Sequence, residues 1–125
     1  GEMRRDFTYV DDLIEAVVRL IDLPPPLPGD RQSPVEGDSL SPAAPWRVVN
    51  IGASEPVALD DFIAALEAAL GRKAERRLLP MQPGDVPQTW ADTGLLERLT
   101  GFRPSVGVAD GVRRFVDWYL NHHHA

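Results

Sequence analysis

RRDFTYVDD, residues 4–12, is the stretch of sequence that decides the fold. The side chains from Arg5 to Val10 alternate and favour extended structure, which predicts a short strand. Asp11 or Asp12 then caps a helix, and Asp12 with Glu15 fits a capping box. The chain is therefore expected to pass directly from a strand into a helix.

That helix is predicted to continue to about Asp22. Its apolar side chains recur at helical spacing and would form one face, made of Leu13, Val17, Leu20 and Ile21.

Residues 23–45 form a Pro-rich stretch with interspersed Gly and Ser. Proline lacks a backbone N–H and fixes φ, so helix and interior strand are both disfavoured here. A loop of this length is uncommon inside a compact domain. The stretch is either a solvated linker or tolerated insertion, or a flap over an active site.

The rest of the chain alternates short elements and turns. In chain order we expect a buried strand at 46–51, a helix at 59–70 ended by Gly71, an edge strand at 75–79, a short helix capped by Asp92 and ended by Gly101, and a helix at 108–120. The inner face of the 59–70 helix is assigned to Phe62, Leu66, Ala69 and Leu70, and that of the last helix to Val112, Phe115, Val116 and Tyr119. Core packing is expected for Trp46, Trp90 and Trp118. The fold class is α/β (α+β), with short strands and about four helices.

Composition limits the possible functions. With 125 residues there is room for one domain, 1–125, with one modest core. The net charge of −6 argues against nucleic acid as a partner, because phosphate backbones need clustered Lys and Arg. No run of apolar residues is long enough for a membrane span, and no signal peptide is visible. The absence of cysteine excludes disulfides and fits a cytoplasmic location.

Several catalytic and cofactor motifs are missing from the sequence. No glycine-rich dinucleotide turn, P-loop or G-x-S-x-G is present, and no pair of histidines has metal-ligand spacing within an element. Neither Tyr9 nor Tyr119 has a lysine four residues later, since Lys73 is the only lysine. We therefore assign no catalytic, cofactor-binding or metal-binding residue to this chain.

The order of motifs resembles the extended short-chain dehydrogenase/reductase family of NAD-dependent epimerases and dehydratases. The resemblance rests on RRDFTYVDD and on three further stretches: VNIGASEPV at 49–57, MQPGDVPQTWAD at 81–92, and GFRP at 101–104 followed by GVRRFVDWY at 111–119. Within that family, the sequences of these motifs are most similar to those of the UDP-glucuronate 4-epimerases. The resemblance spans nearly the whole chain but only the C-terminal third of such an enzyme.

The resemblance implies a C-terminal substrate-binding domain that lacks its Rossmann domain. In the family, the missing N-terminal domain binds NAD and carries the catalytic Tyr-x-x-x-Lys, so this chain alone is expected to bind no cofactor and to be inactive. Its expected partners are a UDP-sugar and that missing domain, with self-association possible when the domain is absent. A 4,6-dehydratase or decarboxylase of the same family is the alternative reaction. A non-catalytic interaction or oligomerisation module is the alternative class.

Four residues are implied as substrate-binding by their match to the family motifs. Arg5 would contact the diphosphate, with a surface pair to Asp6 as the ordinary alternative. Phe7 stands where related galactose epimerases carry a tyrosine near the nucleotide, with simple core packing as its alternative. Gln82 and Asp85 lie in the substrate loop, for which a plain turn is the alternative.

Gln82 occupies the position of a second phosphate-binding arginine in the galactose epimerases, so the second phosphate partner is open. Arg76 or Arg77 could replace it, and solvated charge pairs are the alternative for both.

Overall fold

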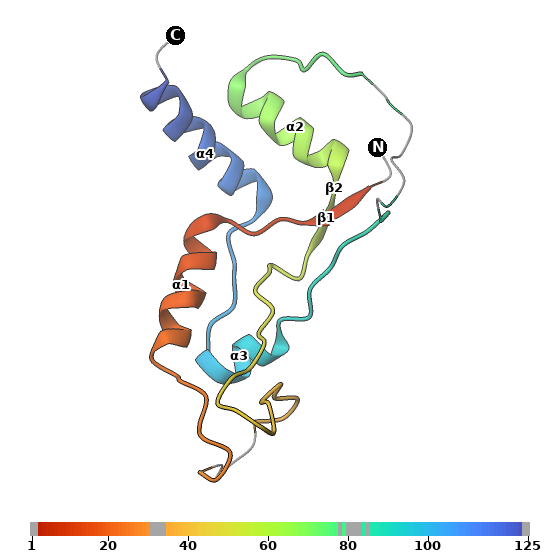
Figure 1. Cartoon of the computed structure of the whole chain (residues 1–125). Helices are drawn as coiled ribbons and strands as arrows, with labels where there is room; N and C mark the ends of the chain where they lie inside the picture. Colours follow the sequence, from red (N-terminus) through yellow and green to blue (C-terminus); the bar gives the residue numbers. More distant parts are fainter. Residues whose placement is uncertain (1–2, 31–34, 78, 80–83, 85, 124–125) are drawn as a thin grey trace.

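The computed structural model describes residues 3–30, 35–77, 79, 84 and 86–123. Within this part the elements are β1 (Arg4–Asp6), α1 (Val10–Ile21), β2 (Pro56–Ala58), α2 (Leu59–Leu70), α3 (Gly94–Thr100) and α4 (Val108–His122) (Figure 1). The predicted fold class is confirmed, because four helices accompany one small sheet.

The sheet is built around β1. On one edge β1 pairs antiparallel with β2, with Arg5 opposite Val57. On the other edge the Arg4 backbone N–H donates to the Pro87 carbonyl over 2.9 Å, and the Thr89 N–H donates back to the Arg4 carbonyl over 3.2 Å. This three-residue strand therefore joins segments that are more than fifty residues away from it in sequence.

The helices pack in two pairs that lie at opposite ends of the molecule (Figure 1). One end is formed by α2 against α4, and the other by α1 against α3. The core is small: the side chains of Ala16, Leu96, Val112 and Val116 are its buried apolar members in the described residues. The β1–α1 connection runs between the two ends, so residues 4–10 occupy the middle of the fold.

The predicted start of the first helix is wrong. β1 ends at Asp6 rather than Val10, and α1 already begins at Val10, with Tyr9 as its N-cap and no side-chain capping bond. The capping box of Asp12 and Glu15 is therefore not formed. Asp12 is buried and instead accepts hydrogen bonds from the amides of Ser105 and Val106. Asp12 lies in the first turn of α1, but its carboxylate binds the backbone of a distant loop instead of capping the helix.

The predicted strand at 46–51 is also wrong. These residues have no strand structure, and the side chains of Trp46 and Val48 are 53% and 62% exposed. They form the return arm of a loop in which the Ser41 N–H donates to the Trp46 carbonyl and the Val48 N–H donates to the Ser39 hydroxyl. One side-chain hydroxyl and one backbone amide thus bond this segment in place of the ladder that a buried strand would need.

The edge strand predicted at 75–79 is not formed by residues 75–77 and 79, the described part of that range. The described residues of 23–45 contain turns and bends but no helix or strand, as the prolines predict.

Helix ends follow their glycines. α2 spans Leu59–Leu70 as predicted, and Gly71 ends it with a left-handed φ of 65°. Gly101 ends α3 in the same way, with φ of 67°. The N-cap of α3 is Thr93 rather than Asp92, although an Asp92 carboxylate oxygen still accepts the Gly94 amide. α4 begins at Val108 as predicted and runs two residues beyond Leu120.

Aromatic side chains are far more exposed than predicted. The three tryptophans are all at least half exposed, so their assignment to the core is wrong. On α4, Val112 and Val116 are buried, whereas Phe115 and Tyr119 lie largely in solvent. The Phe115 ring instead contacts two neighbours on the same helix: it is tilted against Trp118 with centroids 6.0 Å apart, and it stacks on Tyr119 at 6.3 Å.

No helix in the described residues combines the length and the apolar character that crossing a membrane requires.

Candidate functional site

Asp6 is the polar centre of the region that carries the predicted binding residues. One carboxylate oxygen accepts the Ala53 amide over 3.1 Å, and the other accepts the Ser54 amide over 3.0 Å. The second oxygen also accepts the Ala91 amide at 3.4 Å. A single side chain at the end of β1 thereby holds two loops that are distant in sequence.

The 52–54 turn is shaped to approach this carboxylate. A Cβ on Gly52 would stand 2.9 Å from an Asp6 carboxylate oxygen, so only glycine fits without a shift. Ser54 has a left-handed φ of 57°, which is uncommon for a residue with a Cβ. Its hydroxyl is held by the Ala91 carbonyl at 2.9 Å and by the Thr93 hydroxyl at 2.6 Å. These bonds stabilise the unusual backbone conformation.

Arg5 contacts Val86, a described residue of the predicted substrate loop. Its Nη1 donates to the Val86 carbonyl over 2.9 Å and to the Arg4 carbonyl over 3.0 Å. The ordinary alternative, a pair between Arg5 and Asp6, is not found in the described part of the chain, where Asp6 binds backbone amides. The guanidinium is half-buried and positively charged, so it is chemically suited to a phosphate oxygen.

Phe7 forms one wall of an apolar cavity of about 470 Å³. Its ring stacks on Phe62 of α2, with centroids 4.3 Å apart and planes 6° from parallel. The opposite wall includes Gly111 and Val112 at the start of α4, where Tyr9 packs closely enough that a Cβ on Gly111 would approach its ring to 3.1 Å. Phe7 thus packs on α2, as its core-packing alternative predicts, and it also lines the cavity.

Gln82 and Asp85, the two other predicted substrate-binding residues, lie outside the described residues. The described residues on either side, Gly84 and Val86–Gln88, do approach β1 at Val86 and Pro87.

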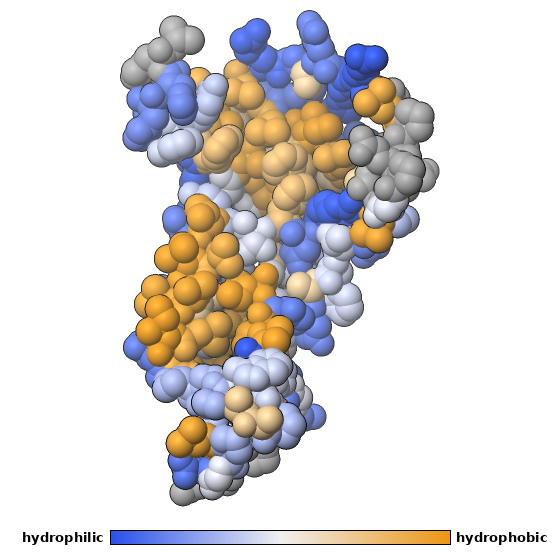
Figure 2. All heavy atoms as spheres, in the orientation of Figure 1, coloured by the Kyte–Doolittle hydropathy of each residue, from blue (hydrophilic) through white to orange (hydrophobic). Residues whose placement is uncertain are grey.

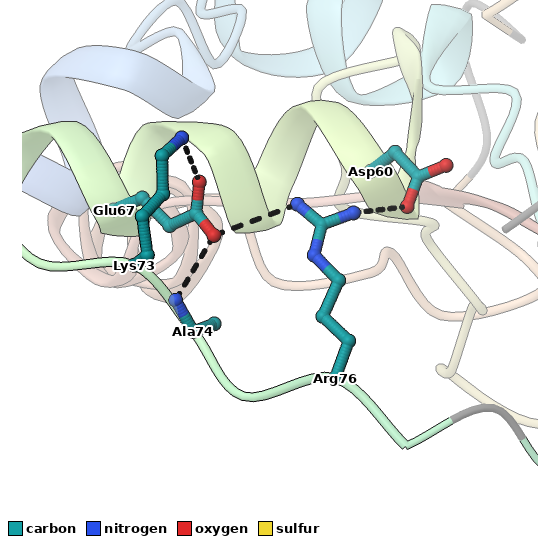
Figure 3. Close-up of polar contacts among 5 residues, drawn as sticks. All are labelled: Asp60, Glu67, Lys73, Ala74 and Arg76. Atoms are coloured by element: carbon teal, nitrogen blue, oxygen red, sulfur yellow. Dashed lines mark hydrogen bonds and ion pairs between the residues drawn. The ribbon is translucent and has the colours of Figure 1, made fainter.

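Arg76 is held in an ion-pair network along α2 (Figure 3). Its guanidinium lies 3.2 Å from an Asp60 oxygen and 3.6 Å from Glu67, which Lys73 also contacts at 2.8 Å. The Lys73 hydrogen bond, with help from the Ala74 amide, lowers the pKa of the Glu67 carboxyl below its ordinary value of 4.5. The alternative of a charge pair is therefore observed for Arg76.

Asp12, in the first turn of α1, forms a second carboxylate clamp, by which we mean a carboxylate that accepts backbone amides from a distant segment, as Asp6 does. One Asp12 oxygen accepts the Ser105 and Val106 amides at 2.8 and 2.9 Å and ties α1 to the segment that leads into α4. Both carboxylates, Asp6 and Asp12, bind the backbone through charge-assisted hydrogen bonds.

The described residues hold no cluster of three or more His, Cys, Asp or Glu side chains that could bind a metal ion. The clamped carboxylates already accept amide hydrogen bonds, and Arg5 is a fixed cation. Among the described residues, this arrangement supplies a cation that can bind and orient an anion. Nor does the sequence supply the glycine-rich turn that would hold the diphosphate of NAD.

Comparison with known proteins finds relatives over nearly the whole chain. No family model matches the chain. It is 54% identical over 120 residues to a probable UDP-glucuronate 4-epimerase of Rhizobium meliloti strain 1021, which is 95% of this chain and 35% of that protein. UDP-glucuronate 4-epimerase 6 of Arabidopsis thaliana is 35% identical, over 98% of this chain and 25% of its own length.

A solved structure shows the same relationship in space. UDP-glucuronic acid 4-epimerase from Bacillus cereus, in complex with UDP-glucuronic acid and NAD, superposes with a TM-score of 0.72 and 29% identity. The superposition covers 98% of this chain and 34% of the epimerase. The chain corresponds to the C-terminal part of the NAD-dependent epimerase/dehydratase family. It spans about a third of the length of the relatives it matches, and the predicted resemblance to the extended short-chain dehydrogenases/reductases is confirmed.

Sequence reasoning missed the two clamps. Asp6 was considered only as a partner for Arg5, and Asp12 only as a helix cap. The available signal was the glycine of the 49–57 motif, because a buried glycine with an ordinary φ often marks the close approach of another group.

Proposed function

We propose that this chain is the UDP-sugar-binding part of an NAD-dependent UDP-glucuronate 4-epimerase. The 54% identity to a probable UDP-glucuronate 4-epimerase, over nearly the whole chain, is the observation that carries the proposal. The structural likeness to an epimerase whose complex contains UDP-glucuronic acid and NAD supports it independently.

Arg5 is proposed to bind the diphosphate. It is fixed at the β1 edge by backbone carbonyls, and a guanidinium can bind phosphate oxygens in a planar, bidentate manner. Phe7 is proposed to face the nucleotide from the apolar cavity, and Gln82 and Asp85 to line the same cleft from the loop. NAD would be held by another part of the protein, since this chain lacks the residues for it.

The exposed face of α1 is proposed to contact that other part, a dinucleotide-binding domain. Figure 2 shows a continuous apolar surface where α1 lies. Its side chains include Ile14 at 53% and Ile21 at 70% exposure, which is unusual for large aliphatic residues on a helix. A solvent-exposed face of this composition is expected to be covered in the working protein.

The decisive experiment compares two proteins with NAD and UDP-glucuronate. The protein at full coding length should convert UDP-glucuronate to its 4-epimer, while the isolated 125-residue chain should show no turnover above a tag-matched blank. Turnover by the isolated chain would overturn the assignment of catalysis to another part. Absence of turnover in the full-length protein, despite UDP binding, would favour another reaction of the family. Absence of both would favour a non-catalytic interaction module.

A further inference from the structure

Asp6 stands between the two residues proposed to bind substrate, Arg5 and Phe7, but its own carboxylate faces the protein. It accepts amides from the 52–54 turn and from Ala91. A group with this many internal partners has little capacity left for a ligand. Its contribution to binding would have to come through the position of its neighbours.

Segment 86–91 is held along β1 at successive points. Val86 receives the Arg5 guanidinium, and Pro87 and Thr89 bond the Arg4 backbone. Asp6 completes the series by binding the Ala91 amide. Three consecutive residues of β1 therefore fix one continuous segment, and Asp6 supplies its last attachment.

The Asp6 carboxylate also fixes the 52–54 turn, which contacts segment 86–91 at Ala91. Ser54 binds Asp6 through its amide and the Ala91 carbonyl through its hydroxyl. Segment 86–91 is consequently held from β1 and from the 52–54 turn together. Release of Asp6 would loosen both supports and let the Val86 carbonyl move relative to the Arg5 guanidinium.

We propose that Asp6 is a positioning residue for UDP-sugar binding, acting through segment 86–91 and the Arg5 side chain. The inference rests on the proposed function, because it takes Arg5 as the diphosphate ligand. Removal of the Asp6 charge is expected to weaken UDP binding on the order of 10-fold, since small displacements of binding groups have large effects on binding and rate.

Asp12 offers a matched control within the same chain. It is also an aspartate that accepts two backbone amides from a distant segment, but it serves the α1–α4 junction. Asp6→Asn and Asp12→Asn should both lower the melting temperature. Only Asp6→Asn should change the affinity for UDP.

The test is calorimetric titration of UDP into the full-length protein and its variants. We compare wild type, Asp6→Asn, Asp12→Asn, Arg5→Ala and the Arg5→Ala/Asp6→Asn double variant. The proposal expects about 10-fold weaker binding for Asp6→Asn and less than about twofold for Asp12→Asn. It expects no further loss when Asp6→Asn is added to Arg5→Ala, because residues that act through one hydrogen-bonded segment are non-additive.

Each other outcome has a defined meaning. Equal effects of Asp6→Asn and Asp12→Asn, or full additivity of Asp6→Asn with Arg5→Ala, would overturn the proposal while leaving the UDP-binding function intact. Wild-type protein that binds no UDP would refute the proposed function itself, and this inference with it.

If Asp6→Asn does not fold, Ser54→Ala tests the same junction by removal of the hydroxyl that holds Ala91 and Thr93. Its UDP affinity should fall in the same direction, and an unchanged affinity would overturn the proposal.

Discussion

Gly52→Ala tests the Asp6 junction most sharply through stability. The added methyl would stand 2.9 Å from an Asp6 oxygen and 3.1 Å from the Ala91 Cβ, where ordinary contacts begin near 3.4 Å. Both neighbours are already tied by the Asp6–Ala91 hydrogen bond, so neither can retreat freely. Overpacking of this kind costs about 1–3 kcal/mol, and reduced freedom of the unfolded chain returns about 0.4–1 kcal/mol.

The midpoints of these two ranges leave a net loss of about 1.3 kcal/mol, or about 5 °C in melting temperature for a chain of this size. Thermal unfolding followed by circular dichroism measures it. Gly29→Ala is the matched control, because nothing lies within 4 Å of a Cβ at that position. Gly29→Ala should be neutral or slightly stabilising. Equal melting temperatures for the two variants would refute the close approach of Gly52 to the clamp.

Three further predictions concern other parts of the molecule. Asp12→Ala should lower the free energy of unfolding by about 2–3 kcal/mol, because it leaves the amides of Ser105 and Val106 without their acceptor. The free energy is measured by urea titration, and a loss of only about 1 kcal/mol would instead indicate a simple helix cap. The neighbours of Glu67 lower the pKa of its carboxyl, so the carboxylate should stabilise the fold at pH values above its ordinary pKa of 4.5 and lose that effect as the pH falls below it. The melting temperatures of Glu67→Gln and wild type should therefore converge at low pH. A difference in melting temperature that stays constant with pH would contradict this. The isolated chain should self-associate at high concentration, and Ile14→Glu on the exposed α1 face should suppress this association. Light scattering that shows a strictly monomeric wild-type chain at millimolar concentration would contradict association through that face.

The elements that the sequence predicted well are those set by local signals. α2 and α4 begin at the expected residues, and Gly71 and Gly101 end their helices, because amphipathic spacing and left-handed glycines act within a few residues. The prolines of 23–45 correctly exclude helix and strand from the described residues there for the same local reason.

The errors come from partners that local patterns do not reveal. Residues 46–51 are apolar enough for a buried strand. The Val48 amide in this range instead donates to the Ser39 hydroxyl within a loop, and Trp46 is exposed. Asp12 fits a capping box by spacing, yet it binds amides more than ninety residues away. The apolar face of α4 was predicted to point inward, but Phe115 and Tyr119 on that face are about half exposed.

The candidate site divides in the same way. The family motif placed Arg5 and Phe7 at the β1 edge, and the structure gives each a definite set of neighbours. Asp6 lies between them in the same motif, but its role depends on where residues 53, 54 and 91 come together in space. Such a convergence is a property of the fold, and no spacing rule predicts it.

The central proposal is that this chain binds the diphosphate of a UDP-sugar through Arg5. Calorimetric titration of UDP into the full-length wild-type protein and its Arg5→Ala variant tests this proposal most directly. A charge-assisted bond is worth about 1.5–3 kcal/mol, so Arg5→Ala should weaken UDP binding roughly 10- to 150-fold. Arg5→Lys should recover only part of that loss, because the planar guanidinium geometry is gone. Equal UDP affinities for wild type and Arg5→Ala would contradict the account.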